Sequence, residues 1–301
     1  MRVFLKRIIF FTLVTAVVFA AADYCLSRYD SHSSSPNMEI WRDVMEGGLD
    51  ADIVALGDSR VSTDFVPWVI DSISGHSSFN LGVIGYHFPI QRIRYEMFAK
   101  RNGNPELLLH FVDNWTFTSA VAKFDKWQFM PWMWSMDFMK SALRSSPRFF
   151  ITITLPWFRY HGYTLSGLTR KRSTVRGYYP NGPENFTPKW ESQEMTFLDD
   201  EAVRERYREF LSEVKAEGVG IVLIIPPFSD EMVFSPGEKE KMRNRFALIA
   251  KELDLPLLDY CDMGICKDTT FFFDECHLKP KGARIFSDTL ANDIKRLGLV
   301  Y

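Results

Sequence analysis

Short apolar runs recur along the chain, and amphipathic stretches of helical length separate them. The runs lack the alternation of a half-exposed strand, which is typical of parallel strands covered on both faces; they lie at 52–56, 78–81, 107–112, 219–225 and 255–259. The stretches between them have the spacing or the boundary residues of helices, and they lie at 61–65, 68–73, 90–101, 200–217, 236–252 and 281–297. This series predicts an α/β fold with a parallel sheet and helices on both of its faces.

The alternation is interrupted between 115 and 199, where no clear rhythm is visible. This insertion is rich in large aromatic residues with basic residues among them, and an irregular segment of this length is more often functional than idle. Either these side chains pack an accessory subdomain, or some line a groove where sugar rings stack or lie against a membrane surface. We therefore expect a lid or substrate-binding subdomain. The residues concerned are Trp127, Phe129, Trp132, Trp134, Trp157, Phe158, Tyr160, Tyr178, Tyr179 and Trp190, with Arg159, Arg170, Lys171, Arg172 and Arg176 among them.

Residues 1–23 have the pattern of a signal peptide or an N-terminal transmembrane anchor. Arg2, Lys6 and Arg7 precede an apolar run over 8–22 that ends in three alanines, which offer a cleavage site. An uncleaved run of about 20 residues can span a membrane. Because the basic residues come first, the rest of the chain is expected outside the cytoplasm. It would be anchored to the membrane and face the periplasm or cell exterior, or be secreted if the signal is cleaved.

The remainder of the chain is expected to hold one large domain. Residues 24–50 would be a tether and lead-in, with a serine-rich tract over 31–36, and the α/β domain would cover 51–301. The formal net charge of −2 and the pI near 6.3 give no electrostatic reason to expect a nucleic acid as partner.

Four cysteines in a chain of 301 residues do not make a disulfide scaffold. In an oxidising compartment two of Cys261, Cys266 and Cys276 can pair, most simply Cys261 with Cys266. A zinc site is the weaker alternative, because His277 is required for the serine site described next and no fourth ligand is evident. We therefore expect neither a metal nor a cofactor.

A polar triplet, Gly57-Asp58-Ser59, ends the first apolar run. In open α/β sheets ligands bind beyond the carboxyl ends of the strands, so Ser59 is either a helix cap or a nucleophile. Near the other end of the chain, Asp274 and His277 are three residues apart. The carboxylate can therefore accept the Nδ1 proton of the imidazole and leave Nε2 facing a serine. Together these residues predict a Ser59–His277–Asp274 triad.

The two blocks resemble the SGNH/GDSL hydrolases, which have Gly-Asp-Ser after the first strand and Asp-x-x-His before a C-terminal helix. The resemblance implies a three-layer α/β/α fold with a flavodoxin-like, five-stranded parallel sheet. It also implies an oxyanion hole that is formed by the backbone N–H groups of Ser59 and a loop glycine, with the side-chain amide of Asn114. The loop glycine is Gly85, with Gly82 as the competing choice. The resemblance covers the sheet-bearing parts of the chain and says nothing about the insertion.

The chain departs from the family pattern at two places. The family has Gly-x-Asn-Asp in its third block, whereas this chain has Val112-Asp113-Asn114-Trp115. The oxyanion hole therefore keeps Asn114, uses two backbone donors only, or has Asp113 in the place of the asparagine. Arg60 stands where the family commonly has leucine. It is either a solvated helix residue or a residue that borders the pocket and binds a carboxylate or sugar hydroxyls.

Three functions from different classes agree with these features. The first is an exported serine esterase that removes O-acyl groups, mainly O-acetyl groups, from a cell-envelope or extracellular polysaccharide. The second is an O-acyltransferase that passes the same acyl group to a glycan, because membrane-anchored SGNH-like proteins that work with a membrane-bound acyl-donor partner have a similar arrangement. The third is a non-catalytic glycan-binding module that has kept the fold.

Overall fold

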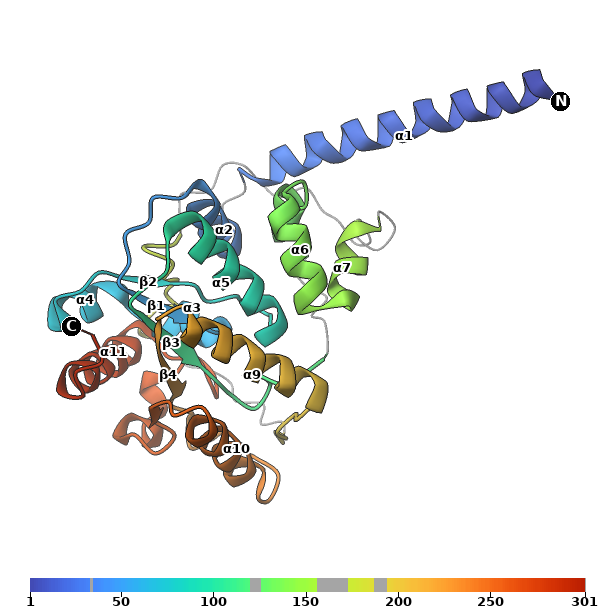
Figure 1. Cartoon of the computed structure of the whole chain (residues 1–301). Coiled ribbons are helices and arrows are strands. Elements are labelled where there is room, and N and C mark those ends of the chain that lie inside the picture. The colour runs from blue at the N-terminus through green and yellow to red at the C-terminus, as the bar shows by residue number, and fades with distance from the viewer. Residues whose placement is uncertain (33–34, 120–125, 156–172, 187–193, 301) are drawn as a thin grey trace.

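The computed structural model describes residues 1–32, 35–119, 126–155, 173–186 and 194–300 (Figure 1). Five strands form one sheet in the order β2-β1-β3-β4-β5, and every neighbouring pair is parallel. This is the strand order of flavodoxin-like sheets, so the expected fold class is confirmed. The strands are β1 (Ile53–Leu56), β2 (Ser78–Asn80), β3 (Leu107–Phe111), β4 (Gly220–Ile225) and β5 (Leu257–Asp259).

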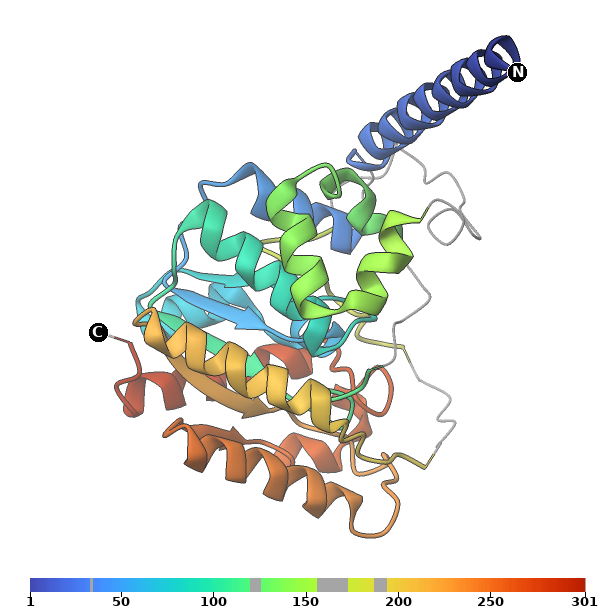
Figure 2. The same cartoon turned by 45° about the vertical axis from the view of Figure 1, so that its right-hand side comes forward.

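Helices cover both faces of the sheet. On one face lie α2 (Pro36–Glu46), α5 (Phe88–Asn102), α9 (Glu201–Ala216) and α10 (Glu238–Glu252), and on the other face lie α3 (Ser59–Asp64), α4 (Pro67–Ser74) and α11 (Pro280–Arg296). Figure 2 shows α5 and α9 in front of the sheet and α11 behind it. Each face of the sheet has its own hydrophobic core. In β1, Val54 and Leu56 pack in the core beneath α2, α5, α9 and α10, whereas Ile53 and Ala55 pack in the core beneath α3, α4 and α11. Burial on both faces explains why the strands read as unbroken apolar runs.

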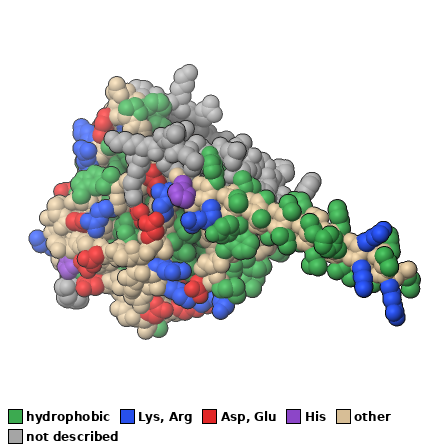
Figure 3. Space-filling view, turned by 90° about the horizontal axis from the view of Figure 1, so that it is seen from above, with side chains coloured by type: hydrophobic (Ala, Val, Ile, Leu, Met, Phe, Trp, Pro, Cys, Tyr) green, Lys and Arg blue, Asp and Glu red, His purple; other side chains and the backbone are tan. Residues whose placement is uncertain are grey.

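The N-terminal helix α1 (Arg2–Asp30) is 29 residues long and projects from the α/β body (Figure 1). Figure 3 shows hydrophobic side chains along it and basic side chains near its free end. The helix is long and apolar enough to cross a membrane, and a signal sequence has the same properties. Its last turns contact the body, because Ser27 is buried and the ring of Tyr24 lies 6.2 Å from that of Trp134. The helix therefore continues beyond the expected end at residue 23.

The folded body begins earlier than the expected boundary at residue 51. Within the expected lead-in, α2 buries Ile40, Trp41 and Val44 completely in the core. Ser35, from the serine-rich tract, caps this helix by accepting the N–H of Met38 at 3.3 Å. Residues 33 and 34 of the tract lie outside the described residues.

The described parts of the insertion form η1 (Lys126–Trp132), α6 (Met136–Ser145) and α7 (Pro147–Thr154). Phe129 is fully buried, and its ring packs against those of Trp41 and Phe149 at 5.7 and 4.7 Å. This aromatic residue therefore packs a subdomain, whereas Trp134 is 53% exposed. Outside the described residues lie Trp157, Phe158, Arg159, Tyr160, Arg170, Lys171, Arg172 and Trp190.

All four cysteines are free thiols, so the expected pairing of Cys261 with Cys266 is wrong for this structure. Cys261 packs in the core on the face that α10 covers. Cys266 lies in a 3-10 helix, η2 (Gly264–Lys267), where its Sγ is directed at the carbonyl of Tyr260 at 3.6 Å. The turn between the two cysteines therefore places their sulfurs in different surroundings. Burial raises the pKa of both thiols, so neither is a ready nucleophile.

Candidate active site

Ser59 is the first residue of α3, just beyond the carboxyl end of β1. The turn between them is tight, because a Cβ on Gly57 would lie 2.4 Å from Cγ2 of Val61. Asp58 caps α3, since its carboxylate accepts the N–H of Arg60 at 2.9 Å. The cap is thus supplied by Asp58, and the hydroxyl of Ser59 is left for another partner.

That partner is His277. Ser59 Oγ lies 2.7 Å from His277 Nε2, and His277 Nδ1 lies 2.8 Å from each carboxylate oxygen of Asp274. The backbone N–H groups of Cys276 and His277 donate to Asp274 Oδ1 at 3.0 and 2.9 Å, which fixes the carboxylate. The structure therefore brings together the three residues that the sequence analysis proposed as a triad.

Two buried polar residues that the sequence analysis did not single out support this arrangement. Asp64, at the end of α3, accepts the N–H of Leu278 at 3.0 Å, and so joins the helix with the serine to the segment with the histidine. Asn80, at the end of β2, donates to the carbonyls of Val61 and Phe65 at 2.5 and 2.9 Å. Both contacts link segments that are far apart in the sequence, so no local pattern signals them.

The hydrogen bond between Asp274 and His277 favours the charged form of each. Burial opposes the charge on Asp274, yet the bond from His277 lowers the pKa of Asp274 to about 2. Burial also opposes the imidazolium, but the Cys276 sulfur and the Asp274 carboxylate raise the pKa of His277 well above 6.5. In the neutral imidazole the Nδ1 proton is held by Asp274, so the lone pair is on Nε2, and this is the atom that can take a proton from Ser59.

Arg60 lies in a buried charge cluster, so the expectation of a solvated helix residue is wrong. Its side chain is 3% exposed, and its Nη2 lies 2.7 Å from Asp113 Oδ2 and its Nε 3.8 Å from Asp58 Oδ1. The guanidinium also lies over the ring of Phe228, 4.5 Å from its centroid. Its Nη1 has no hydrogen-bond partner within the described part of the chain. Binding of a substrate by Arg60 or Asp113 stays a prediction.

The two carboxylates beside Arg60 have opposite pKa shifts. Burial and the charge of Asp113 raise the pKa of Asp58 well above its ordinary value. Burial acts on Asp113 as well, but Arg60 and Asp58 outweigh it and lower the pKa of Asp113. Arg60 and Asp113 therefore form the ion pair, and Asp58 is the group that takes up a proton first.

The parent is expected to become less stable as the pH rises, and Asp58→Asn is expected to lack this decrease. Because the pKa of Asp58 is higher in the folded than in the unfolded state, protonation of Asp58 stabilises the fold fully below the ordinary pKa of 3.8. This contribution is lost as the pH rises through the raised pKa. Each unit of the shift is worth about 1.4 kcal/mol. Asparagine stays neutral and can still accept the N–H of Arg60. Urea denaturation between pH 5 and about 8 tests this. Parallel stability curves for parent and variant would contradict it.

The backbone N–H of Gly85 is available to donate to an oxyanion, whereas that of Gly82 is not. The N–H of Gly82 is already bonded to Asn80 Oδ1 at 2.9 Å. Among the described residues no acceptor is found for the backbone N–H of Gly85, whose φ of 79° suits glycine, or for that of Ser59. Asn114 is buried, and its Nδ2 donates to the carbonyl of Thr196 at 3.4 Å, which leaves its second amide proton for another acceptor.

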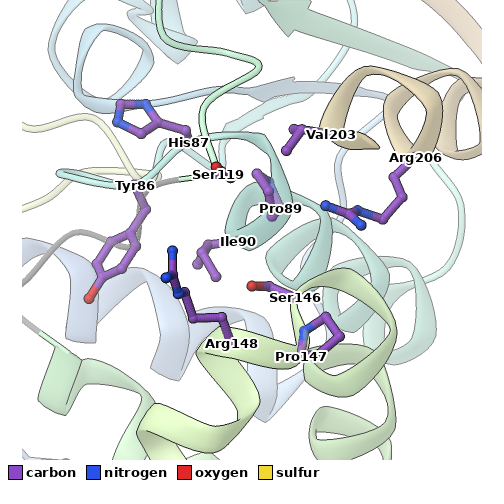
Figure 4. Close-up of a pocket in the computed structure, with 10 residues that line it drawn as sticks. All are labelled: Tyr86, His87, Pro89, Ile90, Ser119, Ser146, Pro147, Arg148, Val203 and Arg206. Carbon is purple, nitrogen blue, oxygen red and sulfur yellow. The ribbon is translucent and has the colours of Figure 1, made fainter. Parts of the chain in front are cut away.

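A cavity of about 260 Å³ lies where the N-terminal parts of α5, α7 and α9 converge (Figure 4). The guanidinium groups of Arg148 and Arg206 border it, and neither forms an ion pair with a described residue. His87 also lines the cavity, and burial lowers the pKa of its imidazole, while the charge of Asp113 acts to raise it and that of Arg60 to lower it. The lining holds none of the three triad residues and consists of Tyr86, His87, Pro89, Ile90, Ser119, Ser146, Pro147, Arg148, Val203 and Arg206.

No family model and no curated protein matches this chain. Among solved structures, it is similar to a protein from Desulfitobacterium hafniense DCB-2 that is provisionally described as a lipolytic protein of the G-D-S-L family. The two chains are 11% identical, the TM-score is 0.42, and the similarity covers 81% of this chain and 99% of that chain. A similarity of this size does not decide the activity, so the function has to be argued from the residues of the site.

Proposed function

We propose that this protein is a serine esterase that removes O-acyl groups, in particular O-acetyl groups, from a cell-envelope or extracellular polysaccharide. The observation that carries the proposal is the chain of hydrogen bonds from Ser59 through His277 to Asp274. It lies at the carboxyl edge of a parallel sheet, where substrates of α/β proteins bind. All three residues are half-buried, so the site is held in place but open to an ester.

In the proposed reaction, His277 Nε2 takes the hydroxyl proton while Ser59 Oγ attacks the acyl carbon. Asp274 holds the Nδ1 proton and stabilises the imidazolium. When the tetrahedral intermediate collapses, Nε2 gives its proton to the departing sugar oxygen and the acyl group stays on Ser59. Water then loses a proton to the same imidazole and attacks the acyl carbon. When this second intermediate collapses, Nε2 returns the proton to Ser59 Oγ and the free acid leaves, which restores the serine.

The backbone N–H groups of Ser59 and Gly85, with the amide of Asn114, would stabilise the oxyanion of both intermediates. Asn114→Ala is therefore expected to lower kcat by about 10²–10³-fold with little change in KM, because this donor acts mainly in the transition state. Steady-state kinetics with 4-nitrophenyl acetate measure the effect. The exposed Asn104 offers a control, since Asn104→Ala should keep the parent's kcat. An unchanged kcat in Asn114→Ala would contradict a role of Asn114 and leave an oxyanion hole formed by the two backbone N–H groups only.

A glycan substrate is supported by exposed indole rings. Trp115 directly follows Asn114, is 38% exposed, and lies with its ring 5.8 Å from that of His87. Trp134, near the end of α1, is also exposed. Indole rings can stack on the apolar face of a sugar ring while their N–H group forms a hydrogen bond. The apolar helix α1 supports a place at the cell envelope.

The acyltransferase alternative uses the same acyl-enzyme, with a sugar hydroxyl in place of water. The apolar helix α1 favours it, because a membrane anchor would hold the site beside an integral-membrane acyl donor. The two functions separate when the full chain is given 4-nitrophenyl acetate with and without a deacetylated oligosaccharide. Rapid release of acetate without the sugar supports the esterase. Slow release together with acetylation of the sugar supports the transferase and overturns the esterase.

A further inference from the structure

The thiol of Cys276 lies against the side of the His277 ring that faces away from Ser59. Its Sγ is 3.5 Å from His277 Nδ1 and 3.6 Å from Asp274 Oδ1. The proposed ester reaction uses neither the sulfur nor any proton on it. Three ligand atoms of different kinds, one sulfur, one ring nitrogen and one carboxylate oxygen, therefore meet within 4.8 Å of one another.

The spacing of these atoms is close to that of a tetrahedral zinc site. With Zn–S near 2.3 Å and Zn–N and Zn–O near 2.0 Å, the tetrahedral edges are about 3.5 Å from sulfur to nitrogen or oxygen, and about 3.3 Å from nitrogen to oxygen. The two observed sulfur distances, 3.5 and 3.6 Å, already match. The distance from Nδ1 to the carboxylate, 2.8 Å, would have to open, because a metal ion would replace the proton between them.

We propose that Asp274, Cys276 and His277 bind one Zn²⁺ ion, which reversibly inhibits the enzyme. Thiolate, imidazole and carboxylate are the ligand types that zinc takes in proteins, and a fourth position filled by water is usual where three protein ligands are present. The side chains of His277 and Asp274 are 21% and 36% exposed, so an ion and a water molecule can reach the site.

Inhibition follows from the change that zinc causes in the protonation of His277, and this step rests on the proposed esterase function. Binding displaces the proton of the Cys276 thiol to solvent, and zinc takes the lone pair of His277 Nδ1. The single proton of the neutral imidazole therefore moves from Nδ1 to Nε2 by exchange with solvent. That nitrogen can donate to Ser59 Oγ but cannot accept its proton, so the serine is not activated. The ion also occupies the carboxylate that would stabilise the imidazolium.

The other cysteines offer no such site. Cys261 and Cys266 are fully buried, and Cys25 is exposed on the N-terminal helix with no cluster of ligands around it among the described residues. Cys25→Ala therefore serves as the matched control for Cys276→Ala, because each variant removes one thiol.

Co²⁺, which takes similar ligands and gives a thiolate-to-metal absorption band, tests binding directly with the full-length protein after chelator treatment. We expect one equivalent to bind with this band in the parent, in Cys25→Ala and in Ser59→Ala. In Cys276→Ala the band should be lost and the affinity for Zn²⁺ should fall by at least about 100-fold. Even the loss of a residue that only hydrogen-bonds to a metal ligand lowers metal affinity by about 10–100-fold. Equal Zn²⁺ affinity in parent and Cys276→Ala would overturn the site.

Ester turnover with added Zn²⁺ tests the inhibition separately. Zinc should stop 4-nitrophenyl acetate hydrolysis by the parent and by Cys25→Ala at concentrations that leave Cys276→Ala active, and a chelator should restore it. Inhibition that is the same in all three proteins would overturn the proposal. Because the Co²⁺ band does not depend on turnover, the metal site can stand even if Ser59 proves not to be a nucleophile.

Discussion

Ser59→Ala is expected to lower the turnover of 4-nitrophenyl acetate by at least about 10⁴-fold, because the variant has no nucleophile to form the acyl-enzyme. The fold should be unaffected. The Ser59 hydroxyl bonds to His277, while the helix cap is supplied by Asp58 and the link between α3 and the histidine segment by Asp64. Steady-state rates and thermal unfolding of the same preparations measure both expectations.

Ser62→Ala is the matched control, because Ser62 lies in the same short helix but its hydroxyl is buried without a partner in the described structure. This variant should keep the rate of the parent. If Ser59→Ala were as active as Ser62→Ala, ester hydrolysis would not pass through Ser59.

Arg60→Met is expected to lower the free energy of unfolding by about 3–5 kcal/mol, because it leaves two buried carboxylates without their cation. Arg60 is 3% exposed, and Asp113 and Asp58 both lie against it. The loss should be largest at high pH, where Asp58 cannot remain protonated, since the pKa of Asp58 is raised in the folded protein. Urea denaturation at several pH values measures both the size and the trend.

Arg243→Met provides the comparison for this prediction. Arg243 is also paired with two aspartates, Asp259 and Asp262, but its side chain is 36% exposed. Ion pairs near the surface contribute about 1 kcal/mol or less, so this variant should lose little stability. Equal losses in Arg60→Met and Arg243→Met would show that burial of the Arg60 cluster has no energetic consequence.

The sheet and its helices could be predicted because their signals are local. Each central strand is a run of apolar residues that both cores use, and the helices carry caps and apolar faces that can be recognised in one sequence. Ser59 and the Asp274–His277 pair could be predicted for the same reason, since an abrupt end of a strand and a spacing of three residues are visible without the fold. In the structure Ser59 Oγ lies 2.7 Å from His277 Nε2.

Features that depend on distant partners could not be predicted. A charged residue in a short helix is ordinarily solvated, and nothing near Arg60 in the sequence shows that Asp113 will pair with it in the interior. Asp64 gives no sign that it will bond to Leu278. The sequence predicts a tether where α2 lies, because the helix is buried through contacts with α5 and η1, which are distant in the sequence.

The most direct test of the central proposal is mass spectrometry of the full chain after a short incubation with 4-nitrophenyl acetate and an acid quench. We expect one acetyl group on the peptide that contains Ser59, its loss over time in water, and no acetyl group in Ser59→Ala. Absence of this adduct, together with equal ester turnover by parent and Ser59→Ala, would contradict the account and favour a glycan-binding module that has kept the fold without the reaction.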